Sequence, residues 1–386
     1  LLKEMVEGPF VERPFVTALR AAEWPASAGG VVTVPVGVED GSGLPCAGWP
    51  VRCGVPFAQG ALKPDAAFEL RGPDGKAVPV QTAPMATWLD GSLKWLLVDF
   101  PADVPADGYV FYTLTGKAGA PVTGTPVAEL RGEEIRLPSG SFTVSGENLL
   151  GLFGPEDLWW EDGVGQKYFF RLQGEGAGVR IEENGVNRAV VKAVGGYYSD
   201  KGRRACLGEL RMECYRQQPF IRLYHTVTFA GDPWKEGLGS YGIRVRLPKA
   251  AFASATVELD KRELTGRALT IYQRSSDHAD ATADGKPTAG RRATGAVLFS
   301  GSAGKTAVYH RDFWRMAPKK LVADAASGTV TFFYWPAEAG AMSFLPREDG
   351  WIPSSSSSEA LAVGLSRTHE ILIAPKCTAP VTAIER

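Results

Sequence analysis

The sequence lacks both a long hydrophobic run and an excess of charge of one sign. No stretch of about 18 apolar residues is present, so we expect no membrane-spanning helix. The 42 Lys and Arg residues nearly balance the 43 Asp and Glu residues, and the formal net charge is -1. Because no long Lys/Arg run occurs either, we predict neither a nucleic acid nor an anionic membrane as a partner.

Cysteine and histidine are also scarce, at five and four residues in a chain of 386. No CxxC pair occurs and no histidine stands at zinc-finger spacing, so we predict no metal and no cofactor. Cys46 and Cys53 could close a small loop as a disulfide, but buried free thiols are the favoured interpretation. Cys206 and Cys214 are predicted to lie on one strand, about 26 Å from each other, and could not bond.

Helical periodicity is nearly absent, whereas short runs of alternating or β-branched residues recur along the chain. The 45 glycines and 27 prolines fit a chain that makes many tight turns between such strands. A chain of 386 residues is too long for one ordinary core. We therefore predict an all-β protein of two domains, preceded by an N-terminal extension over residues 1–29.

Residues 30–118 are predicted to form a small barrel. The run VVTVPVGV at residues 31–38 predicts a strand, and its proline indicates a sheet edge. The turn sequence GPDGK at residues 72–76 predicts a β-hairpin, and LKWLLVDF at residues 93–100 predicts a strand that is buried on both faces. Five or six short strands in about 90 residues are typical of a small barrel.

Residues 119–386 are predicted to form a large antiparallel β-sandwich. The strands are longer here, and Asn184-Gly185 between two of them is the strongest hairpin signal in the chain. The polar stretch from Asp277 to Thr294 is interpreted as a long mobile loop. The five serines at residues 354–358 are interpreted as a solvated loop.

Trp159 and Trp160 are the best candidates for exposed rings that stack on a sugar. They are adjacent, so on a strand they point to opposite sides, and Glu161 and Asp162 after them are polar. Core packing is the competing interpretation for the aromatic residues in general. No pair of carboxylates can be placed at the separation of about 5 or 9 Å that glycosidases use, so no catalytic residue is assigned.

Two histidines lie in informative sequence contexts. Strand alternation puts His225 on the same side as Leu223 and Val227, which indicates a hydrogen-bonded core residue. His369 alternates with Arg367 near the end of the chain. It is either a satisfied residue at a strand end or a residue that faces a cleft at a domain junction, and the sequence supports the two hypotheses equally.

Five segments carry a family resemblance. They are RCGVPFAQGAL at residues 52–62, VQ at 80–81 followed by TWLDGSLKW at 87–95, HRDFW at 310–314 with PK at 318–319, YWP at 334–336 and GLSRTHE at 364–370. In this order they resemble the N-terminal barrel and the central sandwich of the exo-rhamnogalacturonan lyases and their YetA-like relatives. The WxDGSxKW pattern within the second segment is the most specific, and its residues are expected to be structural rather than catalytic.

This resemblance implies a small RIFT-type barrel, a central β-sandwich and a C-terminal α/α toroid, with rhamnogalacturonan cleaved by β-elimination. That reaction needs a base for the C5 proton of galacturonate and a cation for its carboxylate. The toroid is expected to supply most catalytic groups, and no helical pattern for it occurs in this chain. We therefore expect a non-catalytic or incomplete portion of a lyase-like protein, and whether the chain is an enzyme stays open.

The expected function is to act on or bind pectic rhamnogalacturonan, with a polysaccharide or oligosaccharide as partner. The predicted substrate-binding residues are Trp159, Trp160, Arg367, His369 and Glu370. The resemblance also implies an extracellular or cell-surface location in a bacterium. The alternative is a self-assembling extracellular structural protein on the same scaffold, which would form homo-oligomers through edge strands or a domain interface.

Overall fold

The computed structural model describes residues 30–377 apart from 120–123, 132–133, 138–139, 144–148, 234–235, 248–251, 303 and 345–361, together with Val381. These residues form two compact units. Unit 1 holds the described residues up to Val127 and the turn segments Gly185–Arg188 and Tyr215–Gln218, and unit 2 holds the others. The predicted N-terminal extension and the run of five serines lie outside the described residues.

Both units are built from strands. Within the described part of the chain, the helical structure is a single 3-10 turn, η1 (Ala337–Ala339). The predicted all-β class is therefore confirmed. None of the described residues belongs to a helix long and apolar enough to cross a membrane.

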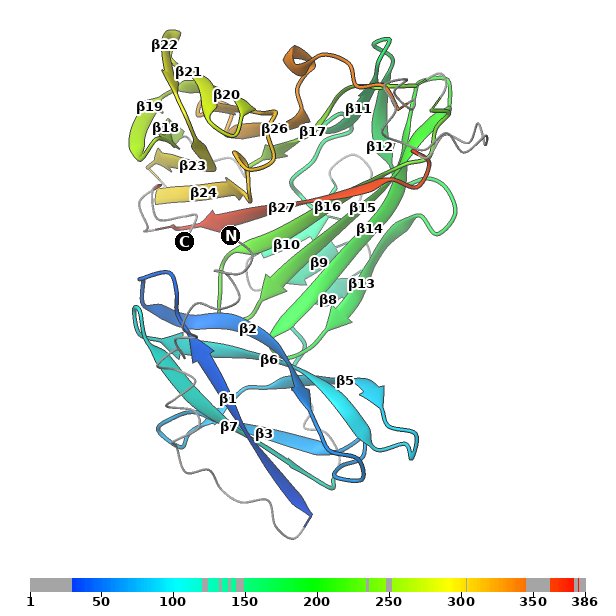
Figure 1. Cartoon of the computed structure of the whole chain (residues 1–386), viewed down its shortest axis with the longest axis vertical. Coiled ribbons are helices and arrows are strands. Elements are labelled where there is room, and N and C mark those ends of the chain that lie inside the picture. Colours follow the sequence, from blue (N-terminus) through cyan, green and yellow to red (C-terminus); the bar gives the residue numbers. More distant parts are fainter. Residues whose placement is uncertain are drawn as a thin grey trace, which may run out of the picture. The chain divides into compact units, whose positions relative to one another are not determined.

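Unit 1 contains two antiparallel sheets (Figure 1). The strand order is β1-β7-β3-β4 in one sheet and β2-β6-β5 in the other. The strands are β1 (Val31–Glu39), β2 (Cys46–Pro56), β3 (Ala67–Arg71), β4 (Ala77–Val78), β5 (Gln81–Thr87), β6 (Leu93–Val104) and β7 (Tyr109–Lys117).

The core of unit 1 lies between these sheets and includes the fully buried Leu70, Leu93, Val98 and Leu114. The predicted hairpin forms, with β3 paired to β4. Strand β1 lies at the edge of its sheet and pairs with β7. Strand β6 lies between β2 and β5, and its face with Leu96, Val98 and Phe100 is buried. The expectation that this strand is buried on both faces is wrong, because Trp95 on the other face is 43% exposed. The expected hairpin and the edge position of β1 are confirmed.

Unit 2 contains a small sheet and one extended antiparallel sheet. The small sheet has the order β10-β9-β8, and the large sheet runs from β11 to β27 in chain order. The large sheet folds back on itself, because β11 also pairs with β17, β17 with β26, and β27 with both β16 and β24. Figure 1 shows β27 lying between β16 and β24.

The strands of unit 2 have the following bounds: β8 (Glu129–Arg131), β9 (Glu134–Leu137), β10 (Gly140–Thr143), β11 (Leu158–Asp162), β12 (Lys167–Arg171), β13 (Gly178–Asn184), β14 (Arg188–Tyr198), β15 (Arg204–Tyr215), β16 (Ile221–Phe229), β17 (Leu238–Arg246), β18 (Phe252–Leu259), β19 (Arg262–Gly266), β20 (Ala268–Ser275), β21 (His278–Ala283), β22 (Lys286–Gly290), β23 (Ala293–Gly301), β24 (Gly304–His310), β25 (Lys319–Asp324), β26 (Thr329–Trp335) and β27 (Ser366–Pro375). The hairpin predicted at Asn184-Gly185 joins β13 to β14.

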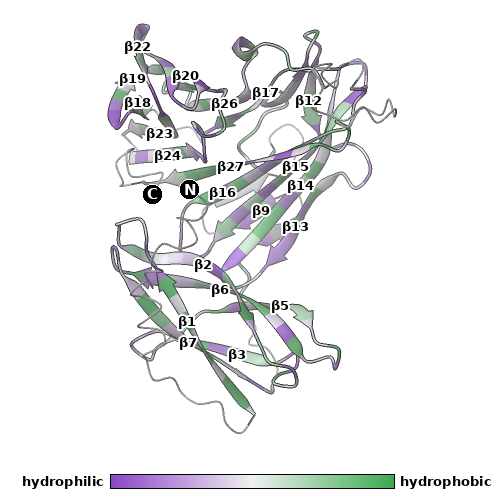
Figure 2. Cartoon of the chain, in the orientation of Figure 1, coloured by the Kyte–Doolittle hydropathy of each residue, from purple (hydrophilic) through white to green (hydrophobic). Residues whose placement is uncertain are grey.

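Side chains alternate between the core and the surface along the central strands of unit 2. In β16 every second residue is buried, from Ile221 through Leu223 to Phe229. Figure 2 shows the corresponding change between hydrophobic and hydrophilic residues along the strands. This period of two is the pattern of a sheet with one face packed against a core and the other in water.

Two sequence-based expectations about local structure are settled here. The mobile loop expected from Asp277 to Thr294 is wrong, because β21 and β22 form a hairpin within it. Asp284 and Gly285 at its turn have φ of 49° and 78°, the left-handed conformation that Asp-Gly adopts readily. Cys206 and Cys214 lie together on β15, as expected, and the five cysteines are free thiols.

We predict that Leu223→Ala lowers the free energy of unfolding by about 2–5 kcal/mol, because the substitution leaves a cavity in a fully buried position of β16. The matched control is Leu207→Ala on the neighbouring β15, whose side chain is 42% exposed. The control is expected to cost less than about 1 kcal/mol. Urea unfolding of both variants checks this, and equal losses would contradict the assigned register of β15 and β16.

Candidate functional site

The interior of unit 2 brings together three of the chain's four histidines. His225 on β16 and His369 on β27 are register partners, and His310 ends β24 on the other side of β27. All three are almost completely buried. The prediction that His225 is a hydrogen-bonded core residue is therefore confirmed.

Three buried tyrosines surround these imidazoles. The Tyr197 hydroxyl lies 2.5 Å from Nε2 of His225, and the Tyr334 hydroxyl lies 3.3 Å from Nδ1 of the same ring. The Tyr241 hydroxyl lies 2.9 Å from Nε2 of His369. The rings of Tyr334 and His369 stack with their centroids 3.6 Å apart and an interplanar angle of 9°.

Burial keeps this cluster neutral. It lowers the pKa of His225 to about 3, and it lowers the pKa of His310 and of His369 well below the usual value. Burial also raises the pKa of Tyr241 and of Tyr334. At neutral pH the cluster therefore consists of uncharged imidazoles and uncharged phenols.

Lys319, the first residue of β25, lies beside this neutral cluster. Its side chain is almost completely buried, and its ammonium nitrogen lies 5.2 Å from the centroid of the Tyr334 ring. Burial, reinforced by the positive charge of Arg367, lowers the pKa of Lys319 to about 7. Lys320, the next residue, points to the other side of the strand and forms an ion pair with Glu338.

A pocket of about 330 Å³ opens onto these residues within unit 2. That volume lies at the lower end of the roughly 300–1,000 Å³ that is typical of small-molecule sites. Its walls combine aromatic rings with three cations, and no carboxylate occurs among the described residues that line it. The aromatic and charged lining residues are Trp160, Phe229, Tyr241, Tyr334, Trp335, Phe344, Arg315, Lys319, Arg367 and His369.

Three of the five predicted substrate-binding residues, Trp160, Arg367 and His369, line this pocket. The other two, Trp159 and Glu370, do not line the pocket, because they lie on the opposite face of their strands from Trp160 and His369. Trp159 packs edge-on against Phe333 with ring centroids 5.1 Å apart, and Glu370 forms an ion pair of 2.9 Å with Arg311. The expectation of two exposed tryptophans needs correction, because Trp160 is only 4% exposed and Trp159 is half-buried.

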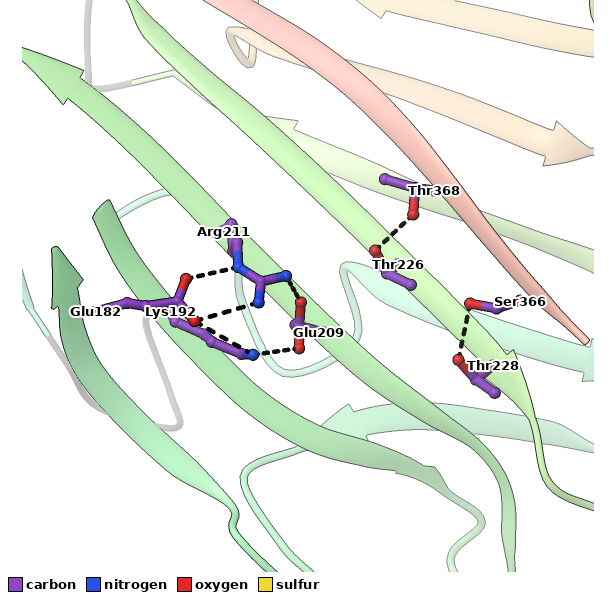
Figure 3. Close-up of polar contacts among 8 residues, drawn as sticks. All are labelled: Glu182, Lys192, Glu209, Arg211, Thr226, Thr228, Ser366 and Thr368. Atoms are coloured by element: carbon purple, nitrogen blue, oxygen red, sulfur yellow. Dashed lines mark hydrogen bonds and ion pairs between the residues drawn. The ribbon is translucent and has the colours of Figure 1, made fainter. Parts of the chain in front are cut away.

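The outer face of the sheet formed by β13 to β16 and β27 is polar, and it carries several paired charges. Figure 3 shows Arg211 between Glu182 and Glu209, and Lys192 bonded to Glu209 at 2.6 Å. Figure 3 also shows the hydroxyl pairs Thr226–Thr368 and Thr228–Ser366 across β16 and β27, at 2.8 and 2.9 Å. The charges drawn on this face neutralise each other. Of the three pocket cations, Arg315 is paired with Asp312, whereas Lys319 and Arg367 have no carboxylate partner among the described residues.

Sequence analysis assigned no site role to Lys319, Tyr241 or Tyr334, although Lys319 and Tyr334 stand in the segments that carry the family resemblance. A weak signal for Lys319 exists, because it alternates with the apolar Leu321 and Ala323 and so shares their face of β25. The tyrosines carry no such signal, since an inward tyrosine on a strand is usually a core residue. Within the described chain, no three His, Cys, Asp or Glu side chains are arranged so that they could hold a metal ion.

These features define an all-β protein whose second unit holds a cationic, aromatic-walled pocket. A family model described as the PcRGLX-like N-terminal RIFT barrel domain matches residues 42–110. A second, the PcRGLX-like protein central beta sandwich domain, matches residues 160–253 and 271–380. The chain therefore belongs to the PcRGLX-like, rhamnogalacturonan lyase-like family, and the predicted barrel and sandwich are confirmed.

Two solved structures from Enterococcus faecalis are similar to the chain at low identity. An alpha-mannosidase from strain V583 has a TM-score of 0.45 and 11% identity, over 89% of this chain and 43% of that structure. A protein in glycosyl hydrolase family 38 has a TM-score of 0.46 and 10% identity, over 88% of this chain and 44% of that structure. The chain thus spans less than half the length of these two proteins. No curated protein matches the chain.

We predict that acid destabilises the protein partly through His225. Its pKa is lowered to about 3 in the folded state, so the unfolded state binds the proton first, and stability is lost as the pH falls from about 6.5 toward 3. Between pH 6.5 and 4.5 the loss from this group is about 2–3 kcal/mol. His225→Gln, which keeps hydrogen-bonding groups, is expected to remove that part of the pH dependence.

The measurement is urea unfolding of each protein at pH 6.5 and at pH 4.5. The matched control is His278→Gln, because the His278 side chain is 56% exposed. The control should keep the pH dependence of the original protein. An unchanged pH dependence in His225→Gln would contradict a neutral, buried His225.

Proposed function

We propose that this chain is the sugar-binding portion of a polysaccharide-lyase-like protein, and that it binds pectic rhamnogalacturonan in the pocket of unit 2. The observation that carries the proposal is the chemistry of the pocket lining. It offers apolar rings and cations together, and the described residues that line it include no carboxylate. Rhamnogalacturonan has a matching group for each, because its rhamnose has apolar faces for the rings and its galacturonate has a carboxylate for the cations.

The aromatic walls suit the C–H faces of sugar rings, which stack on π surfaces. Trp160 contributes its ring to this wall, where it packs against Tyr241 and Phe344 with ring centroids 5.4 and 6.2 Å away.

The cations of the pocket favour an acidic ligand over a neutral one. Arg367 is exposed at the pocket, where its guanidinium contacts the sulfur of Met316, and no carboxylate is paired with it among the described residues. A guanidinium in this position is free to bind a carboxylate through two parallel hydrogen bonds. Uronate carboxylates of this kind occur in pectic polymers. Because these polymers lie outside the cell that degrades them, we propose that the protein is extracellular or lies at the cell surface.

We predict that the protein binds an oligosaccharide of alternating galacturonate and rhamnose, and not a neutral galactan oligosaccharide of equal length. Arg367→Ala should weaken that binding by about 10- to 100-fold, the value of a hydrogen bond to a charged group. Arg180→Ala is the control, because Arg180 is an exposed residue of β13 that does not line the pocket.

Isothermal titration calorimetry with each oligosaccharide measures these affinities. Equal binding of the acidic and the neutral oligosaccharide, or no binding of either, would contradict the proposal. Sedimentation of the same samples completes the test. Concentration-dependent assembly without sugar binding would instead support the self-assembling structural protein.

A further inference from the structure

Lys319 is the most unusual charged residue of unit 2. Its side chain is only 2% exposed, yet an ammonium group carries three hydrogen-bond donors. Among the described residues, its charged head has the π face of Tyr334 as its neighbour and no carboxylate. Buried cations in proteins are normally paired with an anion, and such an anion is missing beside Lys319 among the described residues.

None of the groups that surround Lys319 supplies a negative charge. The imidazoles are neutral because burial lowers their pKa, and the phenols are neutral because burial raises theirs. The remaining charged neighbours are the cations Arg367 and Arg315, and Arg315 is paired with Asp312 at 2.7 Å. The groups that face Lys319 are Tyr241 of β17, His310 of β24, Arg315 before β25, Tyr334 of β26, and Arg367 and His369 of β27.

We propose that Lys319 is an anion-binding group whose missing partner is a carboxylate of the ligand, and that the carboxylate brings a proton onto Lys319 as it binds. The inference rests on the proposed function, because it assigns the carboxylate to a uronate residue of the bound sugar. It adds what that function does not contain, which is a specific buried contact and the regulation of binding by pH.

The direction of the pH dependence follows from the empty pocket. Without ligand, burial and the charge of Arg367 lower the pKa of Lys319 to about 7, so most of the amine is neutral at pH 8. A carboxylate beside the amine favours the charged form and raises this pKa. Binding therefore takes up a proton above pH 7, and affinity is greatest below pH 7 and falls as the pH rises.

The size of the effect follows from the fraction of Lys319 that is charged. The apparent affinity should be up to about 100-fold weaker at pH 9 than at pH 6. At pH 8 each binding event should take up about 0.9 of a proton. The uronate carboxylate is ionised throughout this range, and the buried imidazoles and phenols stay neutral, so neither contributes.

The first experiment uses the unaltered protein. The acidic oligosaccharide is titrated at pH 8 in two buffers that differ in ionisation enthalpy, and the difference in heat gives the number of protons taken up. The same titration with a carboxyl-reduced, neutral oligosaccharide should give no uptake. Acidic oligosaccharide that binds without proton uptake and with equal affinity at pH 6 and pH 9 would overturn the inference and leave the proposed function standing.

Variants of β25 provide the second experiment. Lys319→Met should weaken binding by about 10- to 100-fold at pH 6. Lys319→Arg keeps a charge that does not titrate in this range, so binding should persist without pH dependence. Lys320→Met is the matched control on the neighbouring residue, which faces away from the pocket, and it should retain both affinity and pH dependence.

A third measurement separates the inference from the proposed function. The titration of the Lys319 amine is followed by NMR of protein labelled in its lysine side chains, with and without D-galacturonate. A rise in the pKa of Lys319 when the oligosaccharide does not bind would support the anion site and refute pectic binding. No rise with D-galacturonate, and none with the oligosaccharide, would overturn both.

Discussion

The pairing of β27 with β16 on one side and with β24 on the other is the constraint on which the pocket of unit 2 depends. This register sets His369 opposite His225 and brings His310 to the same interior. Because side chains alternate along a strand, a slip of one residue would turn His369 to the surface and bury Thr368 and Glu370 instead. Burying a carboxylate without partners is so unfavourable that the register is strongly determined.

The titratable groups on the two faces of this sheet are stabilised in different ways. On the outer face, carboxylates and cations lie within bonding distance and neutralise each other in contact with water. On the inner face, burial forces imidazoles and phenols into their neutral forms, and Lys319 has no carboxylate beside it among the described residues. A perturbed, unpaired group next to a pocket is the pattern of functional sites rather than of stable cores.

Part of the site was predictable because strand periodicity determines which residues share a face. Alternation correctly assigned His225 to the core, and it put Trp159 and Trp160 on opposite sides of β11. It also grouped Arg367 with His369, and both line the pocket. Alternation does not tell which face is covered, so Trp160 was expected to be exposed and is buried. The β21–β22 hairpin was missed because its polar strands lack the apolar signal on which strand prediction relies.

The sequence by itself determined the all-β class, the order of barrel and sandwich, and the family, since turn residues, period-two alternation and short motifs are all local properties. Only the tertiary structure decided that residues more than 140 positions apart, such as His225 and His369, lie side by side. It also decided that Lys319 lies in a pocket while Lys320 is paired at the surface. Burial and the absence of a countercharge depend on which strands pack together, and pairing between distant strands leaves no trace in a single sequence.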